Sequence, residues 1–103
     1  MMRDWKKVCA LEEIPRLGSR QVKTASGMIA LFRTVDDEVF ALHDECPHKG
    51  GPLSQGLVAG KVVTCPLHSW KIQLENGAAV APDKGCAKVY PVKVEGGVVW
   101  IAL

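Results

Sequence analysis

The sequence is first informative for what it lacks, beginning with apolar segments. Its longest strongly apolar stretch is residues 98–103, which is far too short to cross a bilayer. Residues 1–7 contain no apolar segment of the kind that forms the core of a secretory signal. We therefore expect no membrane association and a cytoplasmic location.

The sequence also lacks any concentration of positive charge. Its 13 basic residues form no run longer than Lys6-Lys7, and the formal net charge is only +2. Nucleic-acid-binding domains usually show a basic patch or stripe. We therefore expect no nucleic acid partner.

Patterns that indicate substrate chemistry are missing as well. The sequence contains no nucleophile–base–oxyanion arrangement, no phosphate-binding glycine loop and no dinucleotide fingerprint. It also contains no internal repeat and no long helical pattern. We therefore expect no catalytic residue on this chain.

What the sequence does contain is a series of short strand-like segments separated by Gly, Pro, Asn and Asp. Turns are predicted at Ser26-Gly27, Asn76-Gly77 and Gly96-Gly97. The pattern predicts a single all-β domain over residues 1–103, with about ten short strands in a sandwich or open barrel. The expected strands are 5–9, 20–25, 28–34, 38–42, 61–64, 70–74, 88–95 and 98–102, with at most one helical turn at 11–15.

Two segments of the sequence combine cysteine with histidine. The first reads C-P-H-K-G-G-P-L and begins at Cys46, with His48 two residues later. The second reads C-P-L-H-S-W and begins at Cys65, with His68 three residues later. Sixteen residues separate the two motifs, counted from His48 to Cys65. Each motif offers one thiol and one imidazole.

Two thiolates and two imidazoles are the ligands of a Rieske-type [2Fe–2S] cluster, with the cysteines on one iron and the histidines on the other. Two loops at the ends of neighbouring strands could hold such a cluster from opposite sides. A lobe of about residues 44–74 would then carry the cluster between two halves of a base lobe. We predict one cluster, bound by Cys46, His48, Cys65 and His68.

A structural zinc site is the alternative for the same four residues. Zinc also accepts two cysteines and two histidines in a tetrahedral arrangement. Its usual motifs pair cysteine with cysteine and histidine with histidine, however, and a C-x-H motif fits that spacing poorly.

The two motifs resemble the cluster loops of Rieske-type ferredoxins, and the resemblance extends over the whole chain. It is greatest to the small subunits of bacterial NAD(P)H-dependent assimilatory nitrite reductases, and residues 29–33, 39–42, 81–86 and 90–92 contribute to it. The resemblance implies the Rieske fold of three stacked antiparallel sheets. It also implies that Pro82 belongs to a third loop that shields the cluster.

The resemblance further implies an electron-transfer subunit of an oxidoreductase that reduces nitrite to ammonia in nitrate assimilation. Its partner would be a large subunit that carries flavin, an iron–sulfur cluster and sirohaem. The alternative is a free ferredoxin that takes electrons from a reductase to an aromatic-ring-hydroxylating dioxygenase, although such ferredoxins are usually acidic. A third possibility is a structural or regulatory subunit whose cluster senses redox state.

Several other residues have alternative interpretations. His43 lies three residues before Cys46, and we expect a solvated or strand-edge position because the cluster already has two histidines. Cys9 and Cys86 could form a disulfide, but in the cytoplasm free, buried thiols are expected. Three lysines either surround the cluster and attract an acidic partner or are ordinary solvated charges: Lys49, Lys71 and Lys84.

The same resemblance predicts the reduction potential of the cluster. Respiratory-complex Rieske proteins carry an extra, disulfide-bonded cysteine in each loop, where this chain has Gly51 and Leu67. They also carry Ser and Tyr donors where this chain has Trp70 and Ile72. Fewer hydrogen bonds to the sulfurs stabilise the reduced cluster less. We expect a midpoint potential of about −150 mV, the low end of the Rieske range. A redox titration followed by EPR checks this, and a clearly positive midpoint contradicts it.

Overall fold

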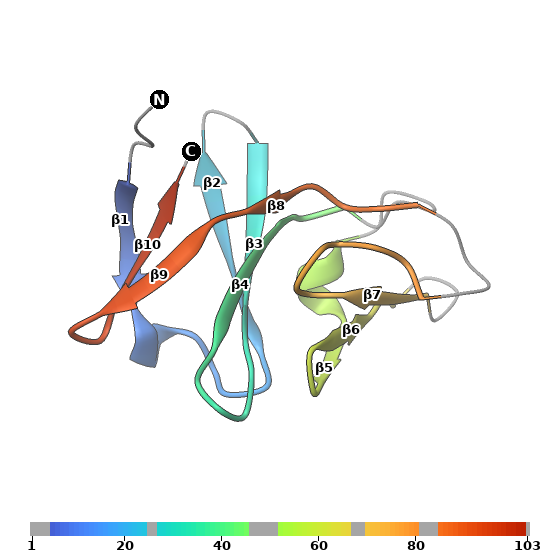
Figure 1. Cartoon of the computed structure of the whole chain (residues 1–103), viewed down its shortest axis with the longest axis horizontal. Coiled ribbons are helices and arrows are strands. Elements are labelled where there is room, and N and C mark those ends of the chain that lie inside the picture. The colour runs from blue at the N-terminus through green and yellow to red at the C-terminus, as the bar shows by residue number, and fades with distance from the viewer. Residues whose placement is uncertain (1–4, 25–26, 46–51, 67–69, 81–84, 103) are drawn as a thin grey trace.

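The structure is a computed structural model that describes residues 5–24, 27–45, 52–66, 70–80 and 85–102, and the structural statements below concern these residues. Their strands form three antiparallel sheets, and two short 3-10 helices lie in the connections between strands (Figure 1). None of the helices in these ranges has the length and apolar composition needed to cross a membrane. The elements are β1 (Trp5–Ala10), η1 (Leu11–Glu13), β2 (Ser19–Thr24), β3 (Gly27–Arg33), β4 (Val39–His43), η2 (Leu53–Gln55), β5 (Leu57–Ala59), β6 (Val62–Thr64), β7 (Lys71–Gln73), β8 (Val89–Tyr90), β9 (Val92–Glu95) and β10 (Val98–Ala102).

The three sheets are stacked side by side along the molecule (Figure 1). The outer sheet has the strand order β1-β10-β9, the central sheet β2-β3-β4-β8, and the small sheet β5-β6-β7. All pairings between these strands are antiparallel. The predictions of an all-β chain and of stacked antiparallel sheets are therefore confirmed.

Strand β3 explains why the central sheet lies between the other two. Four consecutive side chains of β3, Ile29, Ala30, Leu31 and Phe32, are completely buried. Successive side chains of a strand point to opposite faces of its sheet. Ala30 and Phe32 accordingly pack in a core with residues of the small sheet, whereas Ile29 and Leu31 pack in a second core with residues of the outer sheet. The continuous apolar run is thus the pattern of a strand that is covered on both faces.

The β3–β4 turn is held by a carboxylate between two guanidinium groups. Asp37 has a positive φ of 64° and accepts hydrogen bonds from Arg33, at 2.8 and 3.0 Å, and from Arg16, at 3.1 and 3.3 Å. Arg33 also donates to the backbone carbonyl of Ile14 at 2.9 Å. These contacts join the β3–β4 turn to the connection between η1 and β2, so the same ion cluster holds both connections in place.

The structure corrects the prediction of one continuous strand over residues 88–95. The segment is divided at Pro91 into β8, which pairs with β4, and β9, which pairs with β10 in another sheet. Proline has no backbone N–H and cannot continue the ladder of the central sheet. The carbonyl of Pro91 instead accepts a hydrogen bond from Ala102 at 3.0 Å. The chain therefore changes sheets at this residue.

Other differences concern the region between β4 and β8. Strand β5 was not predicted from the sequence. It is only three residues long, and its apolar residue Leu57 is 78% exposed, so it lacks the usual alternation of buried apolar and exposed polar residues. The predicted turn at Asn76-Gly77 is present, with Asn76 Oδ1 accepting from the N–H of Ala78 at 2.9 Å and Gly77 at a positive φ of 74°. Ser26 of the predicted Ser26-Gly27 turn lies outside the described residues.

The chain leaves and rejoins the central sheet at neighbouring points. Leu42 of β4 pairs with Val89 of β8, and the N–H of His43 donates to the carbonyl of Lys88 at 2.8 Å. The intervening residues 44–88 include the whole small sheet. The predicted boundaries of the cluster-bearing lobe, residues 44–74, remain a prediction.

The ion cluster in the β3–β4 turn predicts a specific acid sensitivity. Hydrogen bonds from Arg33 and, to a smaller extent, Arg16 lower the pKa of Asp37 below its ordinary value of 3.8. The stabilisation is present above the unfolded-state pKa and is lost as the pH falls through the lowered folded-state pKa. We expect Asp37→Asn to lower the free energy of unfolding at about pH 6, and we expect its difference from wild type to shrink as the pH falls below 3.8.

Denaturant titrations of both proteins across this pH range measure that difference. Asp36→Asn changes an exposed carboxylate of the same turn and serves as the control. A gap between wild type and Asp37→Asn that stays constant down to the lowest pH would contradict the prediction.

Candidate metal centre

The two Cys-His motifs occupy corresponding places at the ends of strands. The first lies between β4 and η2, and the second between β6 and β7. Of the four predicted ligands, Cys46, His48 and His68 lie outside the described residues, and Cys65 lies within them. The geometry of the centre can therefore be built from Cys65 and from the described chain on either side of each motif.

Cys65 follows β6 directly and is 1% exposed. Its N–H donates to the carbonyl of Trp70 at 2.6 Å, so the two residues that bound the second motif are joined by a backbone hydrogen bond. Trp70 packs against the same core in which Cys65 is buried. A thiol in this position is fixed by the β6–β7 hairpin and excluded from water.

The residues on either side of the first motif belong to that same core. Leu42, near the end of β4, and Leu53, at the start of η2, are both completely buried there together with Cys65. The short helix η2 contacts β2 and β3 of the central sheet. The structure thus brings the chain before and after the first motif into one hydrophobic core with the cysteine of the second.

The third predicted loop begins and ends beside the second motif. The N–H of Val80 donates to the carbonyl of Lys71 at 2.8 Å, and the N–H of Ala79 donates to the carbonyl of Gly85 at 2.9 Å. Residues 81–84, including Pro82, lie outside the described residues. Lys71 is exposed, whereas Lys49 and Lys84 are likewise outside the described ranges, so the proposed role of these lysines stays a prediction.

The donor set fits a [2Fe–2S] cluster of mixed ligation. Within the described ranges no three Cys, His, Asp or Glu side chains come together in a group that could hold a metal ion, and three of the four predicted ligands are outside those ranges. Cys65, the one predicted ligand within the described residues, is buried and restrained by a backbone hydrogen bond, which is compatible with its predicted role as a thiolate ligand. When bound, such a cluster accepts and releases one electron at a time.

The structure describes the remaining histidine and the two cysteines outside the motifs. His43 is the last residue of β4, which lies between β3 and β8, and its side chain is 31% exposed with Nε2 3.6 Å from Glu45, in keeping with the solvated position expected for it. Neither Cys9 nor Cys86 forms a disulfide. Cys9 is buried in the core of the outer and central sheets, and this burial raises the pKa of its thiol. Cys86 is exposed, so the expectation that it is buried was wrong.

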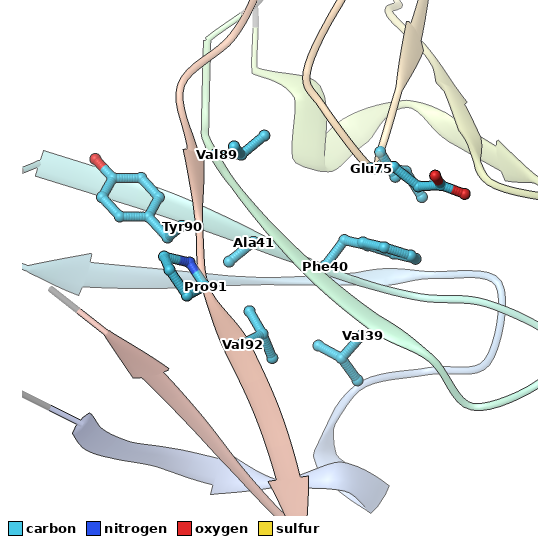
Figure 2. Close-up of a pocket in the computed structure, with 9 residues that line it drawn as sticks. Val39, Phe40, Ala41, Glu75, Val89, Tyr90, Pro91 and Val92 are labelled. Carbon is cyan, nitrogen blue, oxygen red and sulfur yellow. The ribbon is translucent and has the colours of Figure 1, made fainter. Parts of the chain in front are cut away.

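A shallow groove of about 490 Å³ lies along β4, β8 and the start of β9 (Figure 2). It forms where the chain changes sheets at Pro91, and its walls include Phe40, Tyr90 and Val92. Glu75 is the one charged residue among those that line it. Glu75 and Tyr90 are the titratable residues that line it, and the lining includes no serine, cysteine, lysine or histidine.

Comparison with known proteins identifies the class. Residues 4–102 match the family model of the Rieske-like [2Fe-2S] domain. The chain therefore belongs to the Rieske-like [2Fe-2S] domain family, and it is an electron-transfer domain whose cofactor is a [2Fe–2S] cluster. This finding favours the iron–sulfur interpretation of the four-residue donor set over the zinc alternative.

Two kinds of relative are similar to this chain. The ferredoxin subunit of 3-phenylpropionate/cinnamic acid dioxygenase from Photorhabdus laumondii is 39% identical over 98 residues, which cover 93% of this chain and 91% of that subunit. The large subunit of nitrite reductase [NAD(P)H] from Klebsiella oxytoca is 33% identical over 104 residues, which cover 96% of this chain but only 11% of that subunit.

A solved structure agrees closely in fold. It comes from Mycobacterium tuberculosis and is provisionally named as the small subunit of an NADH-dependent nitrite reductase. It superimposes with a TM-score of 0.89 over 100% of this chain and 97% of that chain, at 24% identity. At this identity the similarity supports the fold alone.

The position of Cys65 predicts what its replacement does. Cys65→Ser should abolish the visible absorption and the EPR signal of the reduced cluster, because the thiolate on the buried iron is lost. Both signals and the iron and sulfide content of anaerobically purified protein measure the result.

Cys86→Ser is the matched control, because it removes an exposed thiol and should leave all of these signals unchanged. Full cluster content in Cys65→Ser, or a colourless, zinc-loaded wild type, would contradict the assignment of Cys65.

Proposed function

We propose that this chain is the electron-transfer small subunit of an NAD(P)H-dependent assimilatory nitrite reductase in the cytoplasm. In this proposal Cys46, His48, Cys65 and His68 bind the [2Fe–2S] cluster, and a large sirohaem- and flavin-containing subunit is the partner. Reduction of nitrite to ammonia takes place on that partner, and this chain contributes no catalytic residue of its own.

The role as an electron carrier is supported by the composition of the centre. Four protein ligands complete the coordination of both irons in a Rieske cluster, so no position is left for a substrate. The residues that line the groove along β4 and β8 include no serine, cysteine, lysine or histidine. A redox centre whose coordination is completed by protein ligands acts by exchanging electrons with a partner protein.

The choice of nitrite reductase is carried by one observation. A segment of a nitrite reductase large subunit is 33% identical to 96% of this chain, so a domain of this kind exists within a nitrite-reducing polypeptide. A separate chain with the same domain can serve the same partner as a subunit. The resemblance of residues 81–86 to nitrite reductase small subunits adds support from the sequence.

A second candidate is a ferredoxin for an aromatic-ring-hydroxylating dioxygenase. It is favoured by the 39% identity to a dioxygenase ferredoxin subunit of nearly the same length. Both candidates need the same cluster and differ in the protein that receives its electron. The experiment therefore has to identify that protein.

Copurification from the native host, followed by an assay of nitrite-dependent NAD(P)H oxidation, separates the candidates. We expect wild-type protein to copurify with a sirohaem-containing subunit and His68→Ala to assemble with it while losing at least about tenfold in activity, because one histidine ligand is removed. His43→Ala, which changes a histidine at the end of β4, is the control and should retain activity.

Other results would replace the proposal. Copurification of the wild type with an oxygenase would support the dioxygenase ferredoxin. Unchanged nitrite-dependent turnover in His68→Ala would support a structural or redox-sensing subunit instead.

A further inference from the structure

Asp44 is a carboxylate that is almost completely buried, with 6% of its surface exposed. A buried charge is costly unless hydrogen bonds compensate it. Here Oδ1 accepts from the N–H of Ser54 at 2.7 Å, and Oδ2 accepts from the Ser54 hydroxyl at 2.8 Å and from Nε2 of Gln21 at 2.6 Å. The backbone N–H of Asp44 donates to the carbonyl of Met28 at 3.0 Å. Backbone and side chain of Asp44 are therefore both fixed.

Ser54, the partner of this carboxylate, is itself held from a third direction. The hydroxyl of Ser19 donates to the carbonyl of Ser54, so the N–H, the side chain and the carbonyl of Ser54 are all bonded. Ser19 and Gln21 are two residues apart on β2 and lie on the same face of the central sheet. One face of β2 thus anchors Asp44 and Ser54 together.

The place of these two residues in the chain suggests what the network does. Asp44 immediately follows the β4 region of the central sheet, and Ser54 lies within η2, ten residues further on. Between them lie Cys46 and His48. The second motif is closed by a backbone hydrogen bond from Cys65 to Trp70. The first motif is bounded instead by the contact between the Asp44 carboxylate and Ser54.

We propose that Asp44 is a positioning residue for the first ligand segment, acting through Ser54 and β2 to hold the two ends of residues 45–53 at a fixed separation. The proposal rests on the proposed ligand role of Cys46 and His48. In this arrangement the carboxylate presets the separation of the segment's ends before the cluster binds, which lowers the conformational entropy that binding has to overcome. Asp44 itself need not touch the cluster.

The main test compares Asp44→Ala and Asp44→Asn with wild-type holoprotein. We expect the cluster to be lost about tenfold faster in Asp44→Ala, because all the charge-assisted bonds disappear. The loss should be smaller in Asp44→Asn, because the amide of Gln21 can rotate to accept a hydrogen bond from the new side chain. The g-values of the reduced cluster should change in the same order, since they report the geometry of its ligands.

Ser54→Ala and Asp37→Asn supply the controls. Ser54→Ala keeps the charge of Asp44 and the backbone bond, so a smaller change in the same direction would separate positioning from a through-space effect of the charge. Asp37→Asn removes a carboxylate with several arginine contacts in the β3–β4 turn, at the opposite end of β4 from Asp44. A change of g-values in Asp37→Asn as large as in Asp44→Ala would overturn the proposal, because general destabilisation would then explain both.

A second measurement does not depend on the cluster. Limited digestion with trypsin monitors cleavage after Lys49, which lies within the segment. Faster cleavage there in Asp44→Ala and Asp44→Asn than in Asp37→Asn supports the restraint of this segment by Asp44, whichever protein receives the electron and even if the proposed nitrite reductase function is wrong. Unchanged cleavage together with an unchanged EPR spectrum overturns the role of Asp44 and leaves the proposed function intact.

Discussion

The burial of β3 on both faces is the constraint on which the other layers depend. Its four central side chains are apolar and completely buried, so neither face of the central sheet can be left to solvent. One face requires the outer sheet and the other requires the small sheet. Cys65 is buried in the same core as Phe32, so β3 also helps to fix the one predicted cluster ligand that the structure describes.

Much of this arrangement could be predicted from the sequence, for identifiable reasons. The apolar run of β3 and the alternation around β7 are local patterns with a direct structural meaning. Pro91 was visible as well, but the prediction carried the strand through it, because the partner that each half would choose depends on distant residues. The exposure of Cys86 was missed for a related reason, since residue type alone indicates burial only on average.

The candidate site likewise has features that follow from local sequence motifs and features that depend on contacts between distant residues. The four predicted ligands follow from two short motifs, because metal ligation requires particular residue types at particular spacings. The network around Asp44 gave no such signal. Its partners Gln21 and Ser54 lie 23 and 10 residues away. A single aspartate two residues before a cysteine does not by itself predict such contacts. Only the fold brings these three side chains together.

The pairing of β4 with β8 has a consequence for how such a protein can change over time. The chain leaves the central sheet after His43 and returns to it at Lys88. These two residues are joined by a backbone hydrogen bond from the N–H of His43 to the carbonyl of Lys88. The strands that receive this segment are therefore held together independently of its length. Changes of loop length between these two attachment points therefore leave the pairing of β4 with β8 intact, whereas the apolar residues of the segment that cover β3, such as Val63 and Ile72, have to be kept. In topological terms the segment is a long excursion from a single strand pair, whose loops can vary in length while its core residues cannot.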